Sequence, residues 1–135
     1  MRYLLFFYLL TLIACTSSET SNIQVDDAGN EDFQSFRQTY YTDSLFQLQR
    51  TEFPLSGRDP NGEQERFYWE MDNWRQLKLS DDNPQIKRLP LLNLEGLMVE
   101  RILLQDRFII ETKFSLIDGK WYLTEYSGIQ MPPQR

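Results

Sequence analysis

Cys15 is the only cysteine of this chain of 135 residues, and the chain contains no histidine. Histidine is the commonest general base and the commonest ligand of transition metals, and cysteine and histidine together make most zinc sites. The composition therefore excludes most familiar hydrolase designs, and it predicts neither a metal nor a cofactor. Carboxylates, tyrosines and arginines remain as the groups that can bind a ligand or move a proton.

Cys15 follows a short apolar segment that ends in Leu12-Ile13-Ala14. Arg2 and the free amino terminus make a positive start, and the apolar run from Tyr3 to Ile13 is too short to span a bilayer. The pattern resembles the lipobox of bacterial lipoprotein precursors. It implies diacylglyceryl transfer to the Cys15 sulfur, cleavage before Cys15 and acylation of the new amino terminus. An ordinary secretory signal with a chance cysteine, or an uncleaved anchor, is the alternative.

The charge balance indicates which partners the mature chain would avoid. Removal of residues 1–14 takes away Arg2 and no acidic residue, so the formal charge changes from −6 to −7. An acidic protein is repelled by nucleic acid and by anionic headgroups. Membrane contact is therefore expected through acyl chains such as palmitate on Cys15. Thr16 stands where some lipoproteins carry an Asp that retains them at the inner membrane, which favours the outer membrane of a bacterial cell envelope.

Composition also divides the chain into three parts. Residues 1–14 are predicted to be a lipoprotein signal peptide. Residues 15–30 are the lipidated cysteine and a polar, acidic stretch that cannot bury enough apolar surface to order itself, so a flexible tether is expected. Residues 31–135 are rich in aromatic side chains and are long enough for one small domain.

The domain is predicted to begin with helices. Phe33, Phe36 and Tyr40 recur at i, i+3 and i+7, which places them on one helical face, and Asn30 is a candidate N-cap. Asp43 is expected to cap a second, short helical turn.

Strands are predicted to follow the helices. Alternation from Glu65 to Met71 predicts a half-buried strand with Phe67, Trp69 and Met71 on its inner side. Leu97–Leu104 and Phe108–Ile117 are long β-rich runs. This order predicts an α+β fold in which N-terminal helices pack on a curved antiparallel sheet.

Asp118-Gly119 is a strong hairpin signal between two β-rich runs. A two-residue Asp-Gly loop favours a type I′ turn, which then fixes the register of the two strands. The expected pairs are Leu116 with Trp121, Phe114 with Leu123 and Thr112 with Glu125.

Three stretches of the sequence resemble a known family: EDFQSFRQTYYTDSLFQLQRTEFPL from Glu31, the W-x-x-x-x-W spacing of Trp69 and Trp74, and FSLIDGKWYL from Phe114. Together they resemble the bacterial lipoprotein family catalogued as domain of unknown function 4348. That family is similar to the cystatin-like, nuclear-transport-factor-2-like (NTF2-like) cone fold. The resemblance covers Glu31 to Ser127, and it implies a fold and a location but no catalytic residues.

Thr112 and Glu125 are the first candidate ligand-binding residues. The predicted register puts both on the aromatic face of the hairpin, where a carboxylate can bind or protonate a ligand in the cone. The alternative is that the hairpin outruns the helices and leaves Glu125 in solvent.

Tyr68 and Arg50 are the other two candidates. Tyr68 with Trp69 and Trp74 would form a stacking platform for sugars, although buried aromatics are the commoner outcome. Arg50 would bind an anion, with an ion pair to a nearby carboxylate as the alternative.

Two further groups are better explained without a ligand. Tyr40, Tyr41 and Asp43 are residue types that isomerases of the cone fold use, but their spacing matches no motif, and core and cap roles explain them. Asp81-Asp82-Asn83 lacks the spaced ligands and the glycine of a calcium loop, so a solvated turn is expected.

The sequence as a whole favours a membrane-anchored, noncatalytic module that binds a small molecule, a peptide or an envelope protein. The alternative is a lipid-anchored enzyme, isomerase-like or hydrolase-like, that uses a carboxylate or a tyrosine in the cone pocket. A polar cavity with Glu125 or Asp43 buried inside would favour the enzyme. A cone filled by aromatic and aliphatic side chains would favour the binding module.

Overall fold

The computed structural model describes residues 22–59, 64 and 66–130. The predicted signal peptide, Cys15 and the first part of the predicted tether lie outside the described residues. Within the described part, no helix is both long enough and apolar enough to cross a membrane.

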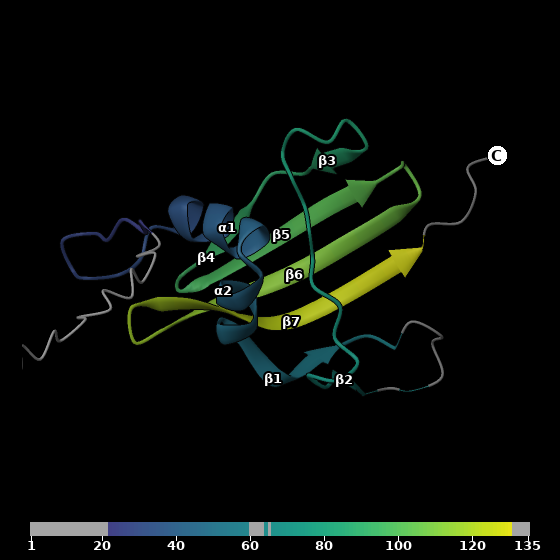
Figure 1. Cartoon of the computed structure of the whole chain (residues 1–135), viewed down its shortest axis with the longest axis horizontal. Helices are drawn as coiled ribbons and strands as arrows, with labels where there is room; N and C mark the ends of the chain where they lie inside the picture. Colours follow the sequence, from purple (N-terminus) through teal and green to yellow (C-terminus); the bar gives the residue numbers. More distant parts are fainter. Residues whose placement is uncertain (1–21, 60–63, 65, 131–135) are drawn as a thin grey trace, which may run out of the picture.

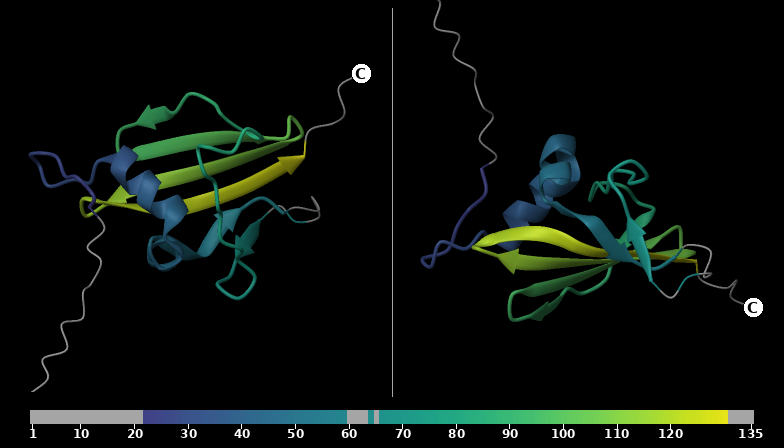
Figure 2. Two further views of the ribbon diagram at one scale, coloured as in Figure 1. Left: turned by 45° about the horizontal axis from the view of Figure 1, so that its top comes forward. Right: turned by 90° about the horizontal axis from the view of Figure 1, so that it is seen from below.

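Two helices cover one face of a single curved sheet (Figures 1 and 2). The helices are α1 (Phe33–Thr42) and α2 (Ser44–Gln49). The strands are β1 (Thr51–Gly57), β2 (Phe67–Trp69), β3 (Ile86–Arg88), β4 (Leu92–Leu94), β5 (Leu97–Leu104), β6 (Phe108–Ile117) and β7 (Lys120–Gln130). The predicted α+β class, with N-terminal helices on a curved sheet, is confirmed.

The sheet has the strand order β2-β1-β7-β6-β5-β3, with β4 beside β5. All neighbouring pairs are antiparallel except β1 and β7, which run parallel. The expectation of a purely antiparallel sheet is therefore wrong at this pair. Alternation within a strand shows which side chains face the core, but it carries no information about a partner that lies seventy residues or so farther along the chain.

The predicted inner face of α1 is confirmed, because Phe33, Phe36 and Tyr40 are all buried. Each of these rings packs against Phe114 of β6, with ring centroids 5.3–5.5 Å apart. Phe114 is itself fully buried, so aromatic side chains fill the space between α1 and the sheet.

The N-cap of α1 is Asp32 and not the predicted Asn30. The Asp32 carboxylate accepts a 2.9 Å hydrogen bond from the backbone N–H of Ser35. Asn30 instead closes a loop with Asp26, whose carboxylate accepts from both the backbone and the side-chain amide of Asn30. Contacts of the domain already begin at Gln24 within the predicted tether, since the Gln24 carbonyl accepts from the backbone N–H of Asp32.

Asp43 caps α2 as predicted, accepting hydrogen bonds from the backbone N–H groups of Leu45 and Phe46. Gln47 of α2 is buried and holds residues 70–85, which run from β2 to β3 across the helical face of the sheet (Figure 1). We call these residues the crossing segment. The side-chain amide of Gln47 accepts from the N–H of Leu77 at 2.7 Å and donates to the Leu77 carbonyl at 2.9 Å. This exchange fixes the crossing segment beside the helices.

The turn predicted at Asp118-Gly119 is confirmed, because both residues have positive φ angles, 50° and 77°. A side chain at Gly119 would meet the Gly29 carbonyl oxygen 3.0 Å from its Cβ, so glycine also allows the N-terminal loop to approach. The predicted pairs of Leu116 with Trp121 and Phe114 with Leu123 are present.

The predicted pair of Thr112 with Glu125 is wrong. The register shifts between Lys113 and Phe114, so Thr112 lies opposite Tyr126 and Lys113 lies opposite Glu125. Thr124 is the extra residue of this β-bulge, and its hydroxyl donates to the Lys113 carbonyl. One inserted residue reverses the side to which Glu125 points, because successive strand residues face opposite sides.

β2 is shorter than the predicted strand. Phe67 and Trp69 are half-buried as expected, but Met71 is exposed because the strand ends at Trp69 and a turn follows. The Asn73 side chain stabilises that turn by accepting from the backbone N–H of Glu70.

Candidate functional site

The four residues predicted to bind a ligand lie in different parts of the domain. Thr112 is fully buried under the helices, whereas Glu125 lies in an ion pair with Lys113 at 2.7 Å. Tyr68 is exposed on β2, while Trp74 is buried in the core, so these two do not share a stacking platform. Ligand binding by these residues stays a prediction, but the structure does not assemble them into one site.

Arg50 forms an ion pair with a carboxylate, which was the alternative to anion binding. Its two terminal nitrogens donate to the Glu31 carboxylate at 2.6 and 2.9 Å, and its guanidinium lies over the rings of Phe46 and Tyr122. Glu31 also accepts from the backbone N–H of Trp121 at 3.0 Å. Arg50 therefore fastens the entry to α1 onto the end of α2 and onto β7.

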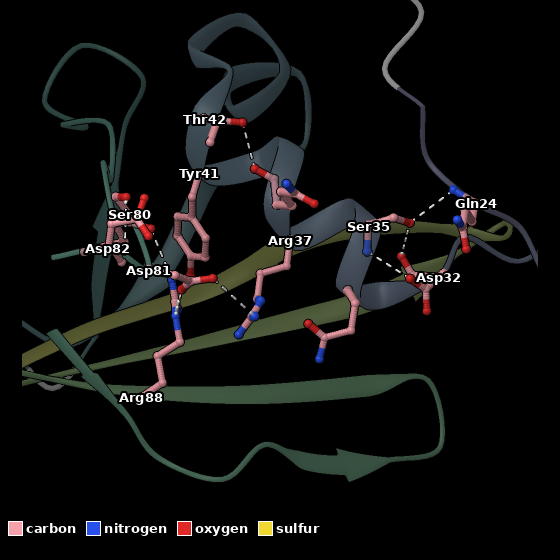
Figure 3. Close-up of a pocket in the computed structure, with 13 residues that line it drawn as sticks. Gln24, Asp32, Ser35, Arg37, Tyr41, Thr42, Ser80, Asp81, Asp82 and Arg88 are labelled. Atoms are coloured by element: carbon pink, nitrogen blue, oxygen red, sulfur yellow. Dashed lines mark hydrogen bonds and ion pairs between the residues drawn. The ribbon is translucent and has the colours of Figure 1, made fainter.

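A groove of about 610 Å³ opens between α1 and the crossing segment, beside β3 (Figure 3). We call it the arginine groove. Its lining is mostly polar and comprises Gln24, Asp32, Gln34, Ser35, Arg37, Gln38, Tyr41, Thr42, Leu79, Ser80, Asp81, Asp82 and Arg88. The volume lies within the usual range for small-molecule sites.

A buried carboxylate, Glu100, lies behind the groove and holds its two arginines. Its side chain is inaccessible to solvent, and its Oε2 atom lies 3.0 Å from Nη1 of both Arg37 and Arg88. The contact with Arg37 is an aligned hydrogen bond, whereas that with Arg88 is an ion pair without hydrogen-bond alignment. The other oxygen, Oε1, accepts a 2.6 Å hydrogen bond from the Tyr41 hydroxyl.

The positions of these residues follow from strand and helix periodicity. Glu100 is in the middle of β5 and lies opposite Thr112 of β6, on the same side of the sheet as the buried Ile102 and Ile110. Arg37 and Tyr41 are four residues apart on α1, so they reach the same point from one helical face.

Burial and neighbouring charges shift the pKa values of two groups in this cluster. Burial, the charge of Glu100 and the hydrogen bond to it raise the pKa of the Tyr41 hydroxyl well above its usual value, so the hydroxyl stays protonated as a donor. Burial works to lower the pKa of the Arg88 guanidinium, but the charge of Glu100 and the hydrogen bond to Asp81 outweigh it, and the net shift is upward. Both groups therefore keep one charge state around neutral pH.

Asp81 contacts the same arginines from the solvent side. Its carboxylate lies 2.5 Å from Nε of Arg88 and 3.9 Å from Nη2 of Arg37, and 67% of its side chain is exposed. Figure 3 shows both guanidinium groups pointing toward this carboxylate. Leu79, two residues earlier, is buried, and its carbonyl accepts from Arg88 Nη2 at 3.1 Å. Asp81 is exposed in a turn, as expected, and it also forms ion pairs with both arginines.

The arrangement suits recognition of a ligand better than proton transfer. Two guanidinium groups meet two carboxylates, and the Tyr41 proton is held by Glu100. Within residues 22–59, 64 and 66–130, no group of three or more possible metal ligands was found. Polar groups of α1 line the open groove: the guanidinium of Arg37, the amides of Gln34 and Gln38, and the hydroxyls of Ser35 and Thr42.

Comparison with known proteins identifies the class of fold. The structure resembles an NTF2-like protein from Bacteroides fragilis NCTC 9343, with a TM-score of 0.54 and 21% sequence identity over 82% of this chain and 51% of that chain. It also matches an NTF2-like protein of unknown function from Shewanella baltica OS155, with a TM-score of 0.42 and 13% identity over 72% of this chain and 85% of that one. The likeness to the Bacteroides protein shows that the chain has an NTF2-like fold, and the chain spans about half the length of that protein. No family model and no curated protein matches the sequence.

Sequence reasoning missed Arg37, Arg88 and Glu100. One signal was available, since Glu100 shares its alternation with Met98, Ile102 and Leu104 in a β-rich run. The other alternation of the same run carries Arg101, so each side of the strand holds one charge. Only the pairing of β5 with β6 decides which of the two charges faces the core.

We predict that Glu100→Gln destabilises the protein by about 3 kcal/mol or more, because it removes the buried counter-ion of two largely buried guanidinium groups and leaves them only the exposed Asp81. The matched control is Glu111→Gln, which removes the same charge from the pair of Glu111 with the half-exposed Arg101 and should cost about 1 kcal/mol or less. Urea unfolding of the variants measures both. Equal losses of stability would contradict the buried role of Glu100.

Proposed function

We propose that the protein is a lipid-anchored, noncatalytic binding module of the bacterial cell envelope and that its ligand occupies the arginine groove. The observation that carries the proposal is the open polar groove at the edge of a core that aromatic side chains have filled. The lipid anchor rests on the sequence around Cys15.

The filled core supports binding over catalysis inside the cone. Phe36, Tyr40 and Phe114 occupy the centre of the space between helix and sheet, where an enzyme of this shape would need a cavity. Asp43 is committed to capping α2, and Glu125 is committed to Lys113. Neither carboxylate lies buried in a cavity, which was the arrangement that would have favoured the enzyme.

The groove has the features of a site for a small polar molecule. Gln34 and Gln38 are exposed one turn apart on α1 and both line it. Arg37 offers guanidinium nitrogens that are held on their inner side by Glu100. Groups that are fixed before a ligand arrives lose little entropy when they bind it.

The lipid anchor is tested by growing the expressing bacterium with radiolabelled palmitate. Wild-type protein should carry the label and Cys15→Ala should carry none, because the thioether and the new acylated amino terminus both depend on Cys15. Equal labelling of the two proteins would contradict the anchor.

The groove is tested by a substitution that fills it. Gln38→Trp should abolish binding of any groove ligand, whereas Leu45→Trp, at an exposed position of α2 outside the groove, should leave binding unchanged. Saturation-transfer NMR with a panel of amino acids, neutral sugars, sugar acids and short peptides measures both variants. Ligands that bind wild type and Gln38→Trp equally, or a panel with no binder, would contradict the proposed site.

A further inference from the structure

We infer that the arginine groove selects a small organic carboxylate with a polar remainder, and that Asp81 occupies the place of this carboxylate until the ligand displaces it. The inference rests on the proposed function, because it names the ligand class of the same groove.

The two arginines are anchored on one side and accessible on the other. Glu100 holds Nη1 of both guanidinium groups from inside the domain. Arg37 and Arg88 keep 18% and 17% of their side chains exposed, and both line the groove. Arginine forks bind carboxylates in a planar geometry that can use two nitrogens at once.

Asp81 already shows where a carboxylate binds. It reaches Arg88 closely, at 2.5 Å, but its distance of 3.9 Å from Arg37 Nη2 is beyond hydrogen-bond length. An incoming carboxylate that approaches over α1 can bind Arg37 more closely than Asp81 does. The exposure of Asp81 keeps its own contact weak, since exposed ion pairs gain little free energy.

The remaining charges favour a single negative charge on the ligand. Asp32 and Asp82 line the groove together with Asp81, and both are exposed. A monocarboxylate adds one negative charge to the groove, and the displaced Asp81 carboxylate can turn into solvent, whereas a phosphate dianion adds two charges and is repelled more strongly by these aspartates. Hydroxyl or amino groups on the rest of the ligand match Gln34, Gln38 and Ser35 along the helix.

The test measures how Asp81 competes with added carboxylates. The full chain in detergent micelles is titrated at neutral pH with D-glucuronate and L-serine as hydroxylated and amino carboxylates, and with D-glucose and inorganic phosphate as controls. Asp81→Ala should bind at least one of the carboxylates about threefold to tenfold more tightly than wild type does. Asp82→Ala removes the same charge one residue away and should gain clearly less affinity than Asp81→Ala, because the ion pairs of the two arginines involve Asp81 and Glu100 and not Asp82.

Asp81→Asn provides a second variant that keeps the size of the side chain and should gain affinity in the same direction. No gain in both Asp81 variants, an equal gain in Asp82→Ala, or a larger gain for phosphate would overturn the inference. A groove ligand that has no carboxylate but is lost in Gln38→Trp would also overturn it and leave the proposed function standing. If no molecule binds in a manner sensitive to Gln38→Trp, both fall.

Discussion

The contact of Glu100 with Arg37, Arg88 and Tyr41 is the constraint on which the candidate site depends. A carboxylate without solvent contact needs its charge compensated and its oxygens hydrogen-bonded, because transfer of an ion from water into a protein costs several kcal/mol. Here the compensation comes from Arg37 of α1 and Arg88 of β3, two elements that both precede β5 in the chain. The electrostatic requirement of one residue therefore links a helix to the edge of the sheet and points two guanidinium groups into the same groove.

Aromatic packing explains why the groove lies at the edge of the domain and not at its centre. Phe33, Phe36 and Tyr40 meet Phe114 in edge-on contacts that fill the space beneath α1. The polar side of α1 is thereby turned toward the crossing segment, which the buried amide of Gln47 holds in place. The same helix thus closes the core with one face and supplies the groove with another.

Much of the fold could be predicted from the sequence, because local patterns determine it. The helical face of Phe33, Phe36 and Tyr40, the cap at Asp43 and the turn at Asp118-Gly119 all depend on neighbours within a few residues. The parallel pairing of β1 with β7 and the bulge at Thr124 depend on contacts between distant segments, and they were missed. The bulge matters most for the predicted ligand-binding pair, since it places Glu125 on the other side of the sheet from Thr112.

The groove itself could not be predicted, because its charged residues are far apart in the chain. Arg37 and Glu100 are 63 residues apart, and each taken alone is an ordinary charge on a helix or in a strand. Only the register of β5 with β6 places Glu100 inside, and only the crossing segment brings Asp81 to the arginines. These charged residues can be recognised as one site only when the fold is known.

The most direct test of the central claim is an NMR measurement of the Nη–Hη groups of Arg37 and Arg88, because Glu100 contacts Nη1 of both side chains. If Glu100 fixes the two guanidinium groups, the wild-type protein should give distinct, slowly exchanging signals for both. In a folded Glu100→Gln variant these signals should move toward those of free arginine and exchange faster with water. Signals that stay unchanged in that variant would show that something other than Glu100 positions the arginines, and they would contradict the account.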